Sequence, residues 1–309
     1  MLSRVAERVY WLARYLERTE NTARLILVRH RSILDMPTSA QPDWGLLLEV
    51  LGAREHFDAH PGAPTERNIV SYVFGERENP SSILSCLAAA RENMRTTREI
   101  LPSETWELVN SLYLSVARRS NKHLPRGSRH KVLNGIVLSC QQITGMLAGS
   151  MNEDAAYQFL RMGRNLERAD MTTRIIDAGS AELGGDGEEI LPFRNVLWIS
   201  VLQSLSAYQM YRLHVQRNVQ PEEVLSFLLQ GKIFPRSVAH CLQVIDDCAG
   251  GLPSNKDALK VIASAQRKLK RVDNAKLKGP TLHDFIDQMQ IKFEDIHSSI
   301  ASTWFGLED

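Results

Sequence analysis

The chain has 309 residues, with 37 Lys or Arg and 36 Asp or Glu, and a formal net charge of +1 at neutral pH. This length predicts one large domain or two ordinary ones. The balanced charge gives no electrostatic reason to expect a nucleic-acid partner. No apolar run reaches the roughly 18 residues that a membrane-spanning helix needs. The N-terminus enters a charged helical pattern directly, without a signal peptide, so we expect a cytoplasmic protein.

Start and stop signals predict helices along almost the whole chain. Ser3 can cap a first helix that runs to about residue 31. Further helices are expected over about 79–100, 102–121, 128–150 and 152–179. The first of these opens with Asn79 and Pro80, and Pro221 and Pro235 each fit the first position of a later helix. Because no run of alternating β-branched residues predicts a strand, the sequence predicts an all-α fold, a multi-helix bundle of about a dozen helices.

The clearest linker is the glycine-rich segment 179–190, which has four glycines in its first nine positions. It divides the chain into a first helical part, residues 1–178, and a C-terminal helical part, residues 191–309. Four dispersed cysteines form no Cys-x-x-Cys, so we expect buried reduced thiols rather than disulfides or a zinc site.

A charged pattern in the first helix recurs 150 residues later, in the helix that ends the first part. The first copy contains Arg14, Glu17, Arg18, Glu20, Thr22 and Arg24, and the second contains Arg164, Glu167, Arg168, Asp170, Thr172 and Arg174. An amphipathic helix needs apolar residues at its period, but it does not need the same charged residues at the same offsets twice. The repeat therefore predicts an internal duplication of this motif helix and is the best functional lead.

Each motif helix also carries apolar and small residues three and four positions apart, which predicts a close-packing seam centred on Leu16 or Leu166. Glu20 and Arg24 are i, i+4 neighbours that flank this seam, and the second copy repeats the arrangement. One interpretation is that these are surface ion pairs or buried struts that orient helices.

The other interpretation is a binding site. Two halves related by a pseudo-twofold axis would bring both copies to one central cleft, where arginine forks bind a carboxylate, phosphate or peptide end and Glu17 and Glu167 hold them in place. A third cluster, in the 79–100 helix, is either a third wall of this site or a solvated helix surface. The complete set of candidate ligand-binding residues is Arg14, Glu17, Arg18, Glu20, Asn21, Arg24, Arg91, Glu92, Asn93, Arg95, Arg164, Glu167, Arg168, Asp170 and Arg174.

Other candidates are weaker. His56 and His60 have metal-ligand spacing on a helix, but no third ligand is indicated, and no nucleotide-binding loop or hydrolase motif is present. We therefore expect neither a metal nor a cofactor. The basic segment from Lys256 to Lys278 is interpreted either as solvated helix charge or as a docking surface for an acidic partner.

The opening residues, from Met1-Leu2-Ser3-Arg4 through Trp11-Leu12-Ala13-Arg14-Tyr15-Leu16-Glu17-Arg18, resemble the bacterial alpha-E domain family, a helical domain of unknown function named for its Glu-Arg motif. The same resemblance is carried by Asn79-Pro80-Ser81-Ser82-Ile83, Ala90-Arg91-Glu92-Asn93, Trp106-Glu107 with Asn110, Met162-Gly163-Arg164 with Glu167-Arg168-Ala169-Asp170, and Pro235-Arg236-Ser237-Val238. These segments extend over nearly the whole chain.

The resemblance implies that the protein is associated with particular enzymes. Members of the family are encoded beside, or fused to, a circularly permuted ATP-grasp protein, often with a transglutaminase-like peptidase and sometimes with a proteasome-like peptidase. ATP-grasp enzymes join a carboxylate to an amine through an acyl phosphate. The leading hypothesis is therefore an accessory or substrate-binding subunit of an ATP-grasp-dependent peptide or amide ligase, which binds an anionic small molecule or peptide and is inactive alone. The alternatives are a self-standing helical enzyme that uses Glu17 and Glu167 as acid or base, and a pure scaffold.

Overall fold

The computed structural model describes residues 3–35, 43–59, 62–120, 124–183, 194–216 and 218–306. Within these ranges the fold has fourteen α-helices, short π- and 3₁₀-helical turns, and no strand, which confirms the all-α prediction. The chain divides into two compact units. Unit 1 ends at Arg164 and unit 2 continues from Asn165, so the boundary lies inside one long helix, α8. Residues 184–193, with most of the predicted linker, lie outside the described ranges.

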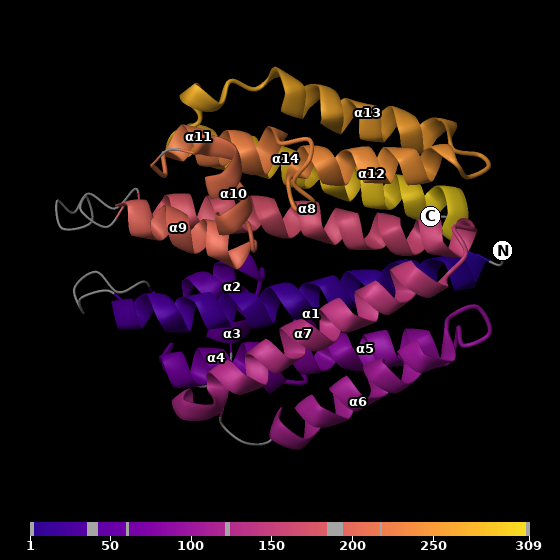
Figure 1. The fold of residues 1–309 in the computed structure, drawn as a ribbon, viewed down its shortest axis with the longest axis horizontal. Helices are drawn as coiled ribbons and strands as arrows, with labels where there is room; N and C mark the ends of the chain where they lie inside the picture. The colour runs from indigo at the N-terminus through magenta and orange to yellow at the C-terminus, as the bar shows by residue number, and fades with distance from the viewer. Residues whose placement is uncertain are drawn as a thin grey trace. The chain divides into compact units, whose positions relative to one another are not determined.

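Unit 1 is built around α1. Its helices are α1 (Ser3–Asp35), α2 (Leu46–Val50), α3 (Arg54–Asp58), α4 (Glu66–Gly75), α5 (Ile83–Arg95), α6 (Ser103–Ser120), α7 (Arg126–Ser150) and the start of α8 (Ala155–Leu183). Helix α1 packs against α5 and α7, and α6 packs against both of these helices (Figure 1). The shorter α4 packs on α5 and α6, and α2 and α3 contact each other. Helix α1 is thus surrounded on several sides.

Unit 2 contains the rest of α8 and the helices that follow it. These are α9 (Arg194–Ser204), α10 (Tyr208–Val215), α11 (Pro221–Leu225), the π-helix η3 (Ser226–Gln230), α12 (Val238–Gly250), α13 (Lys256–Arg271), the 3₁₀-helix η4 (Asn274–Lys276), α14 (Pro280–Ile300) and the π-helix η5 (Ala301–Phe305). Helix α13 packs against α12 and α14, and η3 packs against α12 and α13. In Figure 1 this layer of α12, α13 and α14 is drawn in orange and yellow.

The predicted seams form the cores of the two motif helices. Val9, Leu12, Leu16, Ala23 and Ile26 of α1 are each at most 4% exposed. On α8 the corresponding side chains are equally buried, namely Phe159, Met162, Leu166, Ala169 and Ile176. Spacings of three and four residues keep these side chains on one face of a helix, which is why the periodicity identified them.

Two predicted helix starts were wrong by three residues for the same reason. Helix α5 begins at Ile83, because the Ser82 hydroxyl accepts the Ser85 amide hydrogen (3.1 Å) and caps the helix there. Helix α12 begins at Val238 after the cap of Ser237, so neither Pro80 nor Pro235 is the first helical residue. A serine that satisfies an otherwise unpaired amide group decided the boundary in both units.

The second motif helix is longer than its sequence predicts. The sequence predicts an end at Gly179, but α8 continues to Leu183. A Cβ at position 179 would collide with a methyl group of Val201 on α9, so the glycine allows close helix contact instead of ending the helix. Packing therefore explains the glycine at this position.

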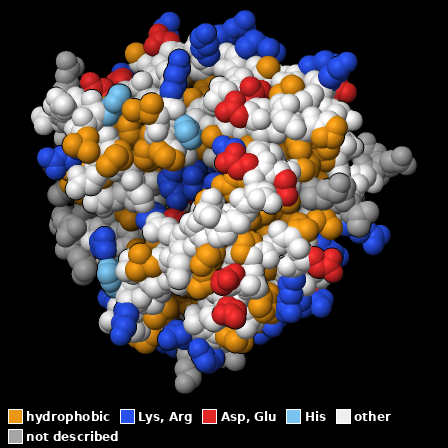
Figure 2. Space-filling model, turned by 45° about the vertical axis from the view of Figure 1, so that its right-hand side comes forward, with side chains coloured by type: hydrophobic (Ala, Val, Ile, Leu, Met, Phe, Trp, Pro, Cys, Tyr) orange, Lys and Arg blue, Asp and Glu red, His pale blue; other side chains and the backbone are white. Residues whose placement is uncertain are grey.

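Acidic and basic side chains are mixed on the protein surface, in keeping with the balanced net charge. Acidic and basic groups are scattered over the face in Figure 2, and Lys and Arg are frequent along its upper edge, where α13 lies in Figure 1. The exposed basic side chains of α13 are Lys256, Lys260, Arg267, Lys270 and Arg271. Helix α7 is long and apolar enough to cross a membrane by composition, a criterion that core helices of soluble proteins also meet.

Candidate functional site

The acidic residues of the first motif copy lie inside the protein. Glu17 and Glu20 are each 3% exposed and Asn21 is 1% exposed. Asn21 Nδ2 donates to Glu17 Oε1 (3.4 Å), and Arg24 Nη2 donates to Glu20 Oε1 in an i, i+4 ion pair. A buried carboxylate is stable when it has such partners, so these acids are already engaged.

Helix α7 completes this polar cluster in unit 1. Gln141 Nε2 donates to Glu20 Oε1 (3.4 Å), so one carboxylate oxygen receives donors from two helices. Cys140, the neighbour of Gln141, is 1% exposed. Burial, together with the negative charges of Glu20 and Glu17, holds the pKa of the Cys140 thiol well above its usual value. The thiol therefore stays protonated and is a poor nucleophile.

Arg14 belongs to an aromatic cluster on the same helix. Its guanidinium carbon lies 4.8 Å from the Trp11 ring centroid and 5.8 Å from that of Tyr10. Trp11 in turn stacks on Tyr15, with 5.4 Å between ring centroids. These distances are in the range of cation–π contacts, so the arginine is positioned by rings one turn or less away.

The second motif copy repeats the ion pair and adds contacts to a loop. Arg174 Nε donates to Asp170 Oδ2 (2.9 Å), as Arg24 does to Glu20 in unit 1. Thr172 Oγ1 donates to the Arg236 carbonyl (2.9 Å), within the segment that precedes α12. Arg168 approaches the neighbouring Pro235 carbonyl with Nη1 at 3.5 Å. The motif helix is thus bonded to the segment that precedes α12.

In both copies the acid is more deeply buried than the arginine it binds. The Glu20 side chain is 4% exposed and that of Arg24 is 13% exposed. For Asp170 and Arg174 the values are 16% and 32%. Glu167 is completely buried, and Arg14, Arg18, Arg164 and Arg168 are half-buried. The carboxylates therefore act as internal supports, and the cations are the groups nearest to solvent.

The third predicted cluster separates into two parts. Arg95 donates from Nε and Nη2 to the two oxygens of Glu92 (2.9 and 2.7 Å), and both side chains are exposed. Arg91 instead turns to α6, where its Nε donates to Asn110 Oδ1 (2.7 Å). Asn93 accepts a hydrogen bond from Thr97 through its backbone carbonyl (2.8 Å). The partners found for Arg91 therefore lie on α6, and the predicted central cleft between the two motif copies stays a prediction.

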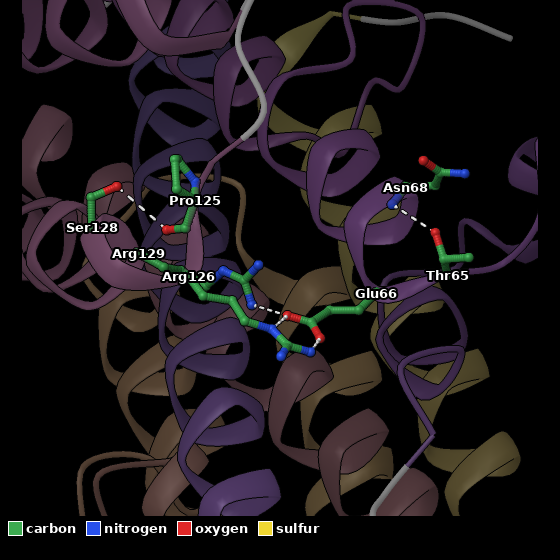
Figure 3. A network of polar contacts seen from close by, with 7 residues as sticks. All are labelled: Thr65, Glu66, Asn68, Pro125, Arg126, Ser128 and Arg129. Carbon is green, nitrogen blue, oxygen red and sulfur yellow. Dashed lines mark hydrogen bonds and ion pairs between the residues drawn. The ribbon is translucent and has the colours of Figure 1, made fainter.

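Sequence reasoning missed a partly buried ion-pair network between α4 and α7, shown in Figure 3. Arg129 is 1% exposed, contacts Glu66 Oε1 through Nη1 (2.5 Å) and lies 5.5 Å from the Trp44 ring centroid. Arg126 donates to both oxygens of Glu66. These hydrogen bonds, that of Arg126 above all, lower the pKa of Glu66 to about 2 although burial opposes the shift. No local pattern links residues 60 positions apart, so the sequence carried little signal for it.

A second repeat was also missed, although the sequence does contain its signal. Pro80, Ser82 and Cys86 in unit 1 have the same spacing as Pro235, Ser237 and Cys241 in unit 2. In both units the serine caps a helix, and the cysteine thiol lies near the proline carbonyl, at 3.7 Å and 3.6 Å. All four cysteines are buried and reduced, as predicted.

The described residues offer few ligands for a metal ion. No group of three His, Cys, Asp or Glu side chains there could hold a metal ion. His56 lies on α3, and its proposed partner His60 is outside the described ranges.

Comparison with known proteins decides the family. The model of the Alpha-E family, described as a predicted alpha-helical domain with a conserved ER motif, matches residues 1–305. The chain belongs to the Alpha-E family. Among the Glu-Arg dipeptides of this Alpha-E chain are Glu17-Arg18 on α1 and Glu167-Arg168 on α8.

The Alpha-E chain is also similar to uncharacterised proteins of Mycobacterium bovis and Mycobacterium tuberculosis. Each is 22% identical over 197 residues, a match that covers 57% of this chain and 22% of the relative. The chain thus spans about a fifth of the length of the curated relatives it matches. No solved structure matches it significantly.

Proposed function

We propose that this Alpha-E chain is an accessory, substrate-binding subunit of an ATP-grasp-dependent peptide or amide ligase system, with a circularly permuted ATP-grasp protein as its partner. The main support for this proposal is a difference in burial that occurs in both motif copies: Glu20 is more buried than Arg24, and Asp170 is more buried than Arg174. Buried acids that orient more exposed arginines are suited to bind an anion. The ligand is an anionic small molecule or a peptide with a free carboxylate.

The buried glutamates favour an accessory role over a self-standing enzyme. A general acid or base must come within hydrogen-bonding distance of the substrate proton. Glu17 is 3% exposed and Glu167 is fully buried, and the buried thiol of Cys140 is held protonated. In this proposal the acyl-phosphate chemistry belongs to the ATP-grasp partner, and the Alpha-E chain positions the carboxylate or the amine that is joined.

The length of the relatives is in keeping with a chain that works beside other domains. Only 22% of each mycobacterial protein is covered by the match, so each carries much additional sequence. In our proposal the exposed basic side chains of α13, among them Lys260 and Arg267, dock an acidic surface of the partner. A transglutaminase-like peptidase is a further partner, and the complex works in the cytoplasm.

The test is reconstitution with the neighbouring ATP-grasp protein. ATP-dependent ligation is measured by ADP release and product mass for a panel of carboxylates and amines, with and without the Alpha-E chain. We expect no turnover by the isolated chain and an increased ligase rate on mixing. A variant with Arg24→Lys and Arg174→Lys keeps both charges but loses the bidentate forks, so the increase should fall about tenfold or more while the fold survives.

The matched control is Arg118→Lys, which changes an exposed arginine of α6 in the same way. It should leave the stimulated rate unchanged. ATP-independent turnover by the purified chain, abolished by Glu17→Gln with the fold intact, would overturn the accessory role. An unchanged ligase rate in the presence of the Alpha-E chain would do so as well.

A further inference from the structure

Arg91 stands in a ladder of alternating cationic and aromatic side chains between α5 and α6 of unit 1. Its guanidinium carbon lies 5.5 Å from the Trp106 ring centroid and 5.2 Å from that of Tyr113. Arg98, which follows α5 in the chain, lies 3.8 Å from the Trp106 centroid on the next step of the ladder. Trp106, Asn110 and Tyr113 are four and three residues apart, so α6 presents all three on one face.

Three groups hold the Arg91 side chain, but they use only one of its nitrogens. Nε donates to Asn110 Oδ1 at 2.7 Å, and the two rings contact the cation without accepting a conventional hydrogen bond. Within the described part of the chain, Nη1 and Nη2 have no hydrogen-bond acceptor. A guanidinium carries five N–H donors in a fixed planar fork, and four of them belong to these two nitrogens.

The nearest acid on the same helix does not neutralise Arg91. Glu92 directs both of its oxygens to Arg95, at 2.9 and 2.7 Å. Arg98 adds a second positive charge to the ladder and is exposed. The half-buried Arg91 therefore keeps its charge and a free pair of terminal nitrogens, and its conformation is set before any ligand arrives. Binding to such a side chain avoids most of the ordering cost that a mobile arginine would impose.

We propose that Arg91 is a carboxylate-binding residue, and that its ligand is an acidic peptide. The two terminal nitrogens of one planar fork match the two oxygens of one carboxylate. Because Asn110 uses its oxygen to hold Nε, its amide nitrogen stays beside the fork as a further donor. The half-buried rings of Trp106 and Tyr113 supply apolar walls for the methylene groups that carry the carboxylate. The biological role rests on the proposed function, because the ligase would use this site to hold an acidic peptide substrate.

The test uses the full chain and three probes. Triglutamate, triglutamine amide and inorganic phosphate are titrated into the protein at low ionic strength by calorimetry. We expect saturable binding of triglutamate, no binding of the uncharged amide, and weaker binding of phosphate. Arg91→Lys should weaken triglutamate binding about tenfold or more, because the ammonium cannot present two planar donors. Arg118→Lys, an exposed change on α6, should leave the affinity unchanged.

A second measurement does not depend on any variant folding correctly. The Nε–H of Arg91 should give a slowly exchanging signal in ¹⁵N spectra because Asn110 binds it, and this signal should move as triglutamate is added. A signal that stays fixed at saturation, equal affinity of Arg91→Lys and wild type, or tighter binding of phosphate than of triglutamate each overturns the assignment. No ATP or ligase is present in these assays. Failure here with intact stimulation of the ligase therefore removes only Arg91, and peptide binding without stimulation removes only the ligase role.

Discussion

Each unit has an ion-pair joint, in which an acidic side chain meets basic side chains at the start of a long helix, but the two joints differ in burial. In unit 1 the acid is Glu66 at the start of α4, and its bases are Arg126 and the fully buried Arg129 at the start of α7. In unit 2 Glu222 on α11 meets Lys278, just before α14, at 3.2 Å, with side chains 41% and 72% exposed. Chain order and sign of charge are the same. The unit 1 pair is more deeply buried than the unit 2 pair. A buried charge that loses its partner cannot be hydrated, whereas an exposed charge can, so breaking the unit 1 pair costs more stability.

The two motif helices and the caps beside them also share local features but differ in their hydrogen bonds. Both units cap a helix with serine, at Ser82 and Ser237, and both repeat the i, i+4 acid–arginine pair. Thr172 bonds the Arg236 carbonyl, whereas the hydroxyl of Thr22 is buried without a hydrogen-bond partner among the described residues. Equal sequence positions therefore do not ensure equal contacts, and variants made in pairs can measure the difference.

The largest difference between the units is expected at the two joints. Arg129→Met leaves Glu66 with Arg126 alone in a partly buried site, so we expect a loss of about 3 to 5 kcal/mol in the free energy of unfolding. Lys278→Met removes an exposed pair and should cost under about 1 kcal/mol. Urea titrations followed by circular dichroism would measure both. Equal losses at the two joints would contradict the role assigned to burial.

Substitutions in the two seams should lower the stability of both units by similar amounts. They therefore serve as the control for the variants at the two joints. Leu16 and Leu166 are 4% and 1% exposed at equivalent positions of the two motif helices. Leu16→Ala and Leu166→Ala should each cost about 2 to 5 kcal/mol, through lost burial and the cavity left behind. The same urea titrations apply. Unchanged stability in either variant would remove that helix from the core.

Two glycines of α8 offer a smaller and more local comparison. A Cβ at Gly163 would collide with the backbone carbonyl of Tyr10 in unit 1, whereas a Cβ at Gly179 would meet the Val201 side chain in unit 2. Gly163→Ala should cost about 1 to 3 kcal/mol because helix backbones must separate. Gly179→Ala should cost less, since a side chain moves more easily and alanine favours the helix by about 1 kcal/mol. Thermal melts of both variants would rank them, and a larger loss at position 179 would contradict this reasoning.

The two units should also show a pH dependence of opposite sign, in which the contribution of His283 is the smallest effect expected. In unit 1 the folded pKa of Glu66 is about 2, below its ordinary value of 4.5, so its stabilisation is present above pH 4.5 and is lost as the pH falls toward 2. In unit 2 the hydrogen bond to Asp177 raises the pKa of His283 above 6.5. Its stabilisation is complete below pH 6.5 and is lost as the pH rises through the raised pKa.

Paired substitutions would separate these two contributions. Asp177→Asn should flatten the stability profile above pH 6.5 by under about 1 kcal/mol, because His283 is an exposed group. Glu66→Gln should flatten the profile between pH 4.5 and 2 instead. A profile above pH 6.5 that Asp177→Asn leaves unchanged would contradict the role of this pair. Burial also lowers the pKa of His30, with the Arg129 charge adding to the shift, so acid should weaken unit 1 at this position too.

Periodicity and capping by themselves determined the helices and the faces they bury. The spacing around Leu16 and Leu166 identified two core seams, because a regular helix places residues three and four apart on one side wherever it occurs. The same local logic found the i, i+4 pair of Glu20 and Arg24. The boundaries of α5 and α12 were missed by three residues, because proline and serine signals competed within one short segment.

Only the tertiary structure decided which charged side chains are buried, which are paired and which keep hydrogen-bond donors available. Arg91 and Arg95 look equivalent in the sequence, yet one is held by α6 with free terminal nitrogens and the other is paired with Glu92. Arg129 became a buried support because Glu66, 63 positions away, lies beside it. Desolvation and partner geometry arise when distant segments assemble, and a local pattern cannot encode them because it specifies neither the dielectric around a charge nor the atoms opposite it.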